Sequence, residues 1–144
     1  MKLHQVVIVF PLGLLATSFF FDLAWLAMHR PELQRAAFRM IAIGVVLGLV
    51  AALLGLRDWL AIPRGTRARR IGALHGVANV VVLLLFAASW MLRRANVEQL
   101  DVATLALSGA GVALSMIAGW LGGQLVDRMF GAPGDAVMRE DGSL

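Results

Sequence analysis

The chain has 144 residues, of which 60% are hydrophobic and only 15% are charged, and its mean hydropathy is +0.80. A soluble domain needs about a quarter charged residues to cover its surface, so this composition excludes an ordinary soluble domain. The charges that give the net +4 are clustered beside apolar runs. That arrangement is typical of residues that set membrane topology, not of a nucleic-acid-binding surface.

Four apolar runs are long enough to cross the hydrocarbon core of a bilayer, which takes about 20 residues. In chain order they are 6–28, 37–56, 71–92 and 104–126. The first run is longer than the apolar region of a signal peptide, so we interpret it as a retained helix. The sequence therefore predicts an all-α integral membrane domain over residues 1–130, followed by a flexible polar tail over 131–144.

Short links between the predicted helices make neighbours antiparallel and give an up-down-up-down bundle with both termini on one side. Basic residues then predict the orientation, because Lys and Arg are enriched in cytoplasmic loops. The side with the termini carries Lys2, Arg57, Arg64, Arg67, Arg69, Arg70 and Arg128, and the other side carries Arg30, Arg35, Arg39, Arg93 and Arg94. We therefore predict a multi-pass protein of the bacterial inner membrane with both termini in the cytoplasm.

Small residues at i+4 spacing indicate where membrane helices can approach each other closely. They are Gly44 and Gly48 in the second run, Gly72 and Gly76 in the third, and Gly111, Ser115, Gly119 and Gly123 in the fourth. Packing within the bundle is the simpler interpretation of these stripes. A homodimer or partner interface is the alternative.

Asp22 lies about two turns inside the end of the first predicted helix. An ionisable side chain at membrane depth is costly and marks either a structural pair or a transport pathway. Arg39 lies just inside the second helix on the same side of the membrane, so we expect a buried structural Asp22–Arg39 pair. A proton or ion carrier using Asp22, and an isolated neutral Asp22, are the alternatives.

His75 and Asn79 are one helical turn apart in the third run, and both are expected to point into the bundle. A hydrogen-bonded packing role is the first interpretation. Histidine is also an axial ligand of haem iron, so a haem b site formed by His75 and His4 is an alternative. His4, however, lies at the extreme start of the first helix, which leaves a depth mismatch of roughly 6–9 Å between the two side chains.

Further polar residues gather at the cytoplasmic rim, where Arg57, Asp58 and Trp59 follow the second run and Gln124 lies near the end of the fourth. Ion pairs at such a wet border contribute little energy individually. We expect Arg57, Asp58 and Gln124 to be buried structural residues that fix how the link between the second and third helices lies against the end of the fourth.

Catalytic motifs are missing from the sequence. There is no cysteine and only three histidines, so we predict neither thiolate chemistry nor a metal site. No serine-hydrolase elbow, zinc-protease helix motif or phosphate-binding loop occurs. The sequence therefore predicts a protein that is not an enzyme and has no cofactor, apart from the haem alternative.

Four stretches of the chain together resemble a known family. They are His4-Gln5-Val6-Val7-Ile8-Val9-Phe10-Pro11-Leu12-Gly13, Gly55-Leu56-Arg57-Asp58-Trp59 with Ile62-Pro63, Leu74-His75-Gly76-Val77-Ala78-Asn79, and Gly119-Trp120-Leu121-Gly122-Gly123-Gln124-Leu125-Val126. In this order they resemble the bacterial membrane proteins catalogued as domain of unknown function 2231. The resemblance covers residues 4 to about 131 and implies a four-helix membrane protein. It also implies an association with redox proteins, since some relatives are fused to or encoded near Rieske-type iron–sulfur proteins.

The chain departs from the family pattern at three places. Val9 stands where a second histidine is usual, Gln124 replaces a usual glutamate, and the last glycine-rich segment reads Gly131-Ala132-Pro133-Gly134. These departures weaken an inherited haem, metal or proton role. We therefore expect an accessory or assembly subunit of a larger membrane complex, such as an electron-transfer complex, whose partners are the lipid bilayer and other membrane subunits or a second copy of itself, with no nucleic acid involved.

Overall fold

The computed structural model describes the backbone of residues 2–130 and the side chains of residues 7–124. Within this part of the chain there are four helices, α1 (Lys2–Met28), α2 (Pro31–Leu60), α3 (Arg67–Arg93) and α4 (Val102–Phe130). All four are long and apolar enough to cross a membrane. The predicted all-α four-helix bundle is therefore confirmed, while the predicted tail over 131–144 lies outside the described residues.

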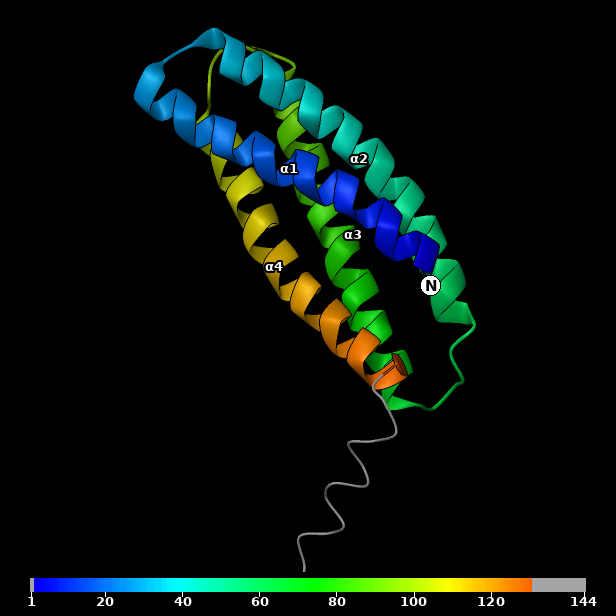
Figure 1. Ribbon diagram of the computed structural model, residues 1–144. Helices are drawn as coiled ribbons and strands as arrows, with labels where there is room; N and C mark the ends of the chain where they lie inside the picture. Colours follow the sequence, from blue (N-terminus) through cyan, green and yellow to red (C-terminus); the bar gives the residue numbers. More distant parts are fainter. Residues whose placement is uncertain (1, 131–144) are drawn as a thin grey trace, which may run out of the picture.

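The helices run lengthwise beside one another and reverse direction at each link (Figure 1). The α1–α2 turn and the α3–α4 link lie at one end of the bundle, which we call the distal end. The start of α1, the α2–α3 link and the end of α4 lie at the other, the terminal end. α1 packs along α2 and α3 along α4, so the fold consists of two helical hairpins joined mainly through α2 and α3.

Each helix extends beyond the apolar run that predicted it, because helical hydrogen bonding continues into the headgroup region where polar side chains are tolerated. The largest difference is at the start of α2, which begins at Pro31 and not at residue 37. Proline suits the first position of a helix because its missing N–H would have no partner there. The α1–α2 link is thus only His29 and Arg30, and His29 takes the left-handed conformation (φ 51°) that ends α1.

The middle of the bundle is closed by a small apolar core of Leu15 from α1, Ile41 from α2, and Val82 and Phe86 from α3. Glycines let the helices meet there. A Cβ on Gly44 would lie 2.8 Å from Leu15 Cδ2, and one on Gly111 would lie 2.6 Å from Phe86 Cε2. A Cβ on Gly48 would overlap Leu83 in the same way.

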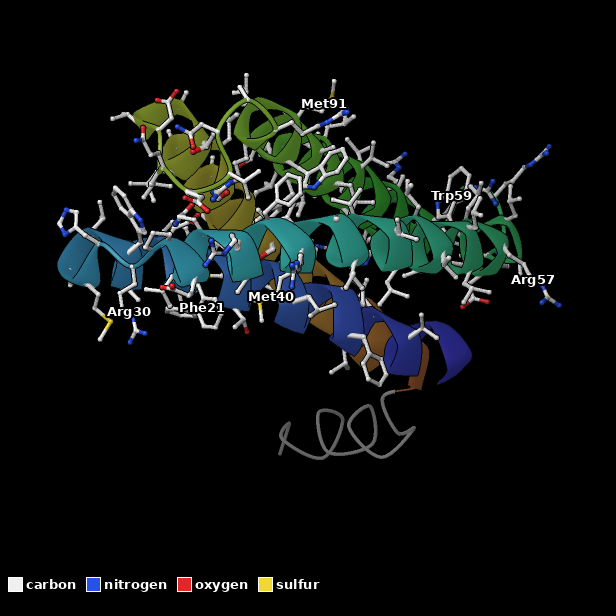
Figure 2. All side chains as sticks on the ribbon, turned by 90° about the horizontal axis from the view of Figure 1, so that it is seen from above. Phe21, Arg30, Met40, Arg57, Trp59 and Met91 are labelled. Atoms are coloured by element: carbon white, nitrogen blue, oxygen red, sulfur yellow. The ribbon has the colours of Figure 1, made fainter. Side chains whose placement is uncertain are left out.

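Large apolar side chains cover the outside of the bundle, as Figure 2 shows for Met91. In water such a surface would drive aggregation, but in a bilayer it faces acyl chains of the same polarity. The polar groups that the bundle buries therefore lie between the helices, away from this apolar surface.

Candidate functional site

A cluster of polar side chains is buried at the distal end, and it is centred on Arg93 at the end of α3. Arg93 is 3% exposed and Asp22 is fully buried. Arg93 Nη1 donates to Asp22 Oδ1 over 2.8 Å, and Arg93 Nη2 donates to Asp22 Oδ2 over 2.6 Å. This fork-to-fork geometry is the strongest arrangement available to a carboxylate and a guanidinium.

The remaining donors of Arg93 are also used. Nη1 donates to Gln34 Oε1 (2.8 Å), Nη2 to Ser108 Oγ (3.2 Å) and Nε to Ser89 Oγ (3.2 Å). An arginine has five N–H groups. With the two bonds to Asp22, every one of them therefore has a protein acceptor, and no donor is left over for a ligand in this conformation.

The partners of Arg93 are tied to one another as well. Gln34 Nε2 donates to Asp22 Oδ1 (3.0 Å), and the Ser89 hydroxyl donates to the Thr104 carbonyl (3.0 Å) and lies 2.9 Å from Ser108 Oγ. These residues come from all four helices. We call Arg93, Asp22, Gln34, Ser89, Thr104 and Ser108 the Arg93 cluster.

The sequence-based pairing of Asp22 with Arg39 is wrong. The partner of Asp22 is Arg93, and Arg39 is exposed on α2. Because α2 begins at Pro31, Arg39 lies more than two turns into the helix, on its outward side. Burial of Asp22 follows from its place in a long apolar run, but the run does not identify Arg93 as its partner.

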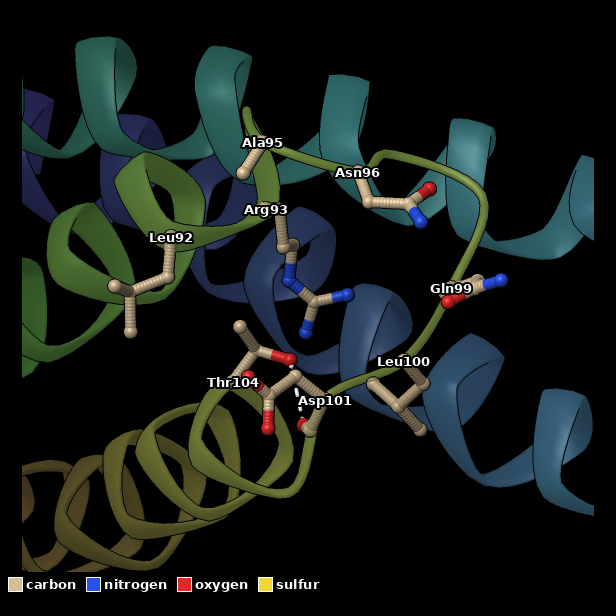
Figure 3. A pocket seen from close by; sticks show the side chains of 8 residues that line it. All are labelled: Leu92, Arg93, Ala95, Asn96, Gln99, Leu100, Asp101 and Thr104. Carbon is tan, nitrogen blue, oxygen red and sulfur yellow. Dashed lines mark hydrogen bonds between the residues drawn. The ribbon is translucent and has the colours of Figure 1, made fainter.

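The Arg93 cluster borders a pocket of about 340 Å³ beneath the α3–α4 link, which Figure 3 shows from close by. Its lining residues are Leu92, Arg93, Ala95, Asn96, Gln99, Leu100, Asp101 and Thr104. Asp101 closes the start of α4, since its Oδ1 accepts from Ala103 N (3.1 Å) and its carbonyl accepts from Thr104 Oγ1 (2.7 Å). The pocket therefore brings the distal aqueous side up to the edge of the cluster.

A second polar junction joins α3 to α4 towards the terminal end. His75 Nδ1 lies 2.8 Å from the Ala118 carbonyl, and because a carbonyl can only accept, Nδ1 carries the proton. Nε2 then accepts from Asn79 Nδ2 over 3.1 Å, and the same Nδ2 donates to the His75 carbonyl over 2.8 Å. The ring lies over Gly122, where a Cβ would come within 2.9 Å of His75 Cε1.

His75 thus contacts α4, Asn79 is bonded to His75, and both residues are half-buried. The side chain of His4, the other proposed haem ligand, lies outside the described residues. Among residues whose side chains the structure describes, no three His, Cys, Asp or Glu are grouped as metal ligands. The structure therefore links His75 to α4 and to Asn79, and both of its ring nitrogens are bonded in that junction.

At the rim of the terminal end, Trp59 and Arg69 hold the α2–α3 link. Trp59 Nε1 donates to the Arg69 carbonyl (3.0 Å), and the Arg69 guanidinium lies 4.3 Å from the centre of the Trp59 ring. Arg69 Nη1 also donates to the Ile62 carbonyl (2.6 Å). The α2–α3 link is therefore fastened to the start of α3. Arg57, which was predicted to be buried, lies in the last turn of α2, is exposed and points away from the bundle (Figure 2).

The remaining predicted polar residues lie at this rim too. Asp58 and Gln124 are both half-buried. The side chain of Arg128 lies outside the described residues.

The predicted packing glycines divide into two groups. Gly44, Gly48, Gly72 and Gly111 are buried in the bundle, and Ser115 is half-buried with its hydroxyl bonded to the Val112 carbonyl. Gly76, Gly119 and Gly123 are all exposed, and a Cβ at any of them would meet no described atom of the chain within 4 Å. At the level of Gly119 and Gly123, the residues of α4 that face α3 are Ala118 and Gly122, which lie against His75. A stripe at i+4 spacing rotates by about 40° per step around a helix, so its last two glycines have turned away from the side that α3 covers.

Four apolar membrane-length helices around buried polar junctions define a multi-pass integral membrane protein. The chain matches the family of predicted membrane proteins catalogued as domain of unknown function 2231 over residues 1–131, and it belongs to that family. Neither the comparison with curated proteins nor the comparison with solved structures found a match.

Proposed function

We propose that this protein is a non-catalytic accessory or assembly subunit of a larger membrane complex of the bacterial inner membrane, such as an electron-transfer complex. The observation that carries the proposal is the complete satisfaction of Arg93, whose five N–H groups are all bonded to side chains of the bundle. A buried charge used in this way fixes the relative positions of helices, which is the task of a scaffold.

The surface near the His75 junction supplies a place for a partner. Gly119 and Gly123 on α4 and Gly76 on α3 are exposed, with no described atom of the chain within 4 Å of their Cβ positions. Glycines that face lipid gain nothing from their small size, whereas glycines beneath another helix allow close backbone contact. This favours a partner helix over lipid at that surface.

The test is affinity purification of the tagged chain from gently solubilised membranes, comparing wild type with Gly119→Leu/Gly123→Leu. We expect a membrane protein to co-purify in fixed stoichiometry with wild type and to be lost from the double variant. Gly13→Leu is the matched control, since Gly13 is also exposed and open, but on α1. Recovery of this chain alone from every preparation would refute the proposal.

The haem b alternative is less favoured by the geometry around His75. Donation from Nδ1 to a backbone carbonyl leaves Nε2 as the basic nitrogen, which suits a metal ligand. However, Nε2 accepts from Asn79, so an iron atom would have to displace that side chain. We therefore propose that His75 ties α3 to α4, and we expect purified protein expressed with haem to show no Soret band.

The carrier alternative through Asp22 is also less favoured. The Asp22 carboxylate accepts from Arg93 Nη1, Arg93 Nη2 and Gln34 Nε2, so carriage of a proton or ion would require this cluster to open. Transport that is abolished by Asp22→Asn in a folded bundle would favour the carrier over the scaffold.

A further inference from the structure

One exposed face of α3 changes from basic to apolar along its length. Arg67 and Arg70 are exposed at its start. At helical spacing they continue into Leu74 (60% exposed), Val77 (63%), Val81 (39%) and Leu84 (63%). We call these six residues the α3 lipid face. It presents two guanidinium groups above a strip of branched aliphatic side chains.

The charges at the start of this face are not balanced within the described part of the chain. The first turn of α3 contains no acidic residue, and Arg67 and Arg70 form no ion pair with the described side chains. The start of a helix already carries a partial positive charge. Arginines at this position therefore repel the helix terminus and each other, and an external anion would relieve both repulsions.

The neighbouring residues hold this arrangement in place. Thr66 caps α3 by accepting from Arg69 N (3.2 Å), and Arg69 itself is turned back onto Trp59 and the Ile62 carbonyl. Arg69 is thereby removed from the lipid face, while Arg67 and Arg70 remain outward. Arg67 and Arg70, which form no ion pair with the described side chains, therefore lie one turn apart on the outward side of the helix start.

The depth of the face matches that of a phospholipid. α3 has 27 residues, which at 1.5 Å per residue is about 40 Å, against about 30 Å for the hydrocarbon core. Its first turn therefore lies at headgroup level, and Leu74 to Leu84 lie beside the acyl chains. A free anion would use only the arginines, whereas a lipid would use the whole face.

We propose that the α3 lipid face binds an acidic phospholipid, with the phosphate between Arg67 and Arg70 and one acyl chain along Leu74, Val77, Val81 and Leu84. Guanidinium groups suit phosphate because their forked donors match its oxygens. This site is independent of the partner surface formed by the exposed glycines, and its failure would leave the accessory-subunit proposal untouched.

The test is native mass spectrometry of the full chain in non-ionic detergent, titrated with phosphatidylglycerol and with phosphatidylcholine of the same acyl chains. Each arginine near an anionic surface contributes about a fivefold gain in affinity. We therefore expect wild type to prefer phosphatidylglycerol and Arg67→Gln/Arg70→Gln to bind it roughly 30-fold more weakly. The single variants R67Q and R70Q, each expected to weaken binding about fivefold, serve if the double variant does not fold.

Arg30→Gln/Arg39→Gln is the matched control, since it removes two exposed arginines from other places in the bundle. It should keep the preference for phosphatidylglycerol. An equal loss of affinity in this control would mean that net charge alone explains the preference, and it would overturn the site. An undiminished preference for phosphatidylglycerol in the α3 variants would also overturn the site. Displacement of the lipid by inorganic phosphate at matched concentration would show an anion site in place of a lipid site.

Discussion

Arg93 and Arg94 are consecutive in the sequence, yet their side chains lie in opposite environments. Arg93 is buried and bonded across the bundle, while Arg94 is exposed, with its guanidinium 5.4 Å from the centre of the Trp90 ring. Removing one partner of a buried ion pair leaves the other charge without compensation, which costs about 3–5 kcal/mol. We therefore predict that Arg93→Gln lowers the free energy of unfolding by about 3 kcal/mol.

Thermal unfolding of the purified protein in detergent measures this effect. Arg94→Gln is the control, because it makes the same chemical change one residue away and should alter stability by less than about 1 kcal/mol. Equal melting temperatures for the two variants would mean that the Arg93 cluster contributes little to holding the helices together.

Also at the scale of single residues, the sequence correctly predicted that Asp22 is buried, but it did not predict that Arg93 is its partner. A carboxylate in the middle of an apolar run is buried whatever the details of packing. The choice between Arg39, Arg93 and Arg94 depends on the rotation of α2 and α3 about their axes over many residues. A shift of one residue would exchange Arg93 for Arg94, and the hydropathy pattern does not fix that rotation.

At the scale of the helices, the hydropathy of the sequence was enough to find all four, and it missed only their polar ends. Spacing alone did not show which small residues are covered. The stripe of α4 contains both Gly111, under the ring of Phe86, and Gly119, which meets nothing within 4 Å. Telling them apart requires the crossing point of α3 and α4, which depends on side-chain packing along both helices.

This difference gives a prediction for α4. Gly111→Ala places a methyl group 2.6 Å from Phe86 Cε2, and Phe86 is 1% exposed, so the ring has little room to move. We expect a loss of about 1–3 kcal/mol from overpacking. Gly119→Ala adds the same methyl group to the same helix in open space and should not destabilise the fold.

Thermal unfolding of the two variants in detergent compares them directly. If Gly111→Ala melts with wild type, α3 and α4 do not meet at Phe86 as closely as described. If Gly119→Ala melts well below wild type instead, α4 is packed on a different face.

For the whole molecule, an even number of membrane-length helices places the start of α1 and the end of α4 on the same side. Which side that is depends on the basic residues, four of which (Arg64, Arg67, Arg69 and Arg70) lie in or beside the α2–α3 link. Since such clusters are retained in the cytoplasm, we predict that the terminal end is cytoplasmic and the distal end periplasmic.

The absence of cysteine from the sequence makes this orientation directly measurable, because one introduced cysteine is the only thiol in the protein. Ala61 in the α2–α3 link and Ala95 in the α3–α4 link are both exposed, and Ala→Cys changes no charge at either position. In intact spheroplasts, a membrane-impermeant maleimide should label Ala95→Cys at once and Ala61→Cys only after lysis. The reverse pattern would place the α2–α3 arginines outside the cell and would show that they do not set the topology.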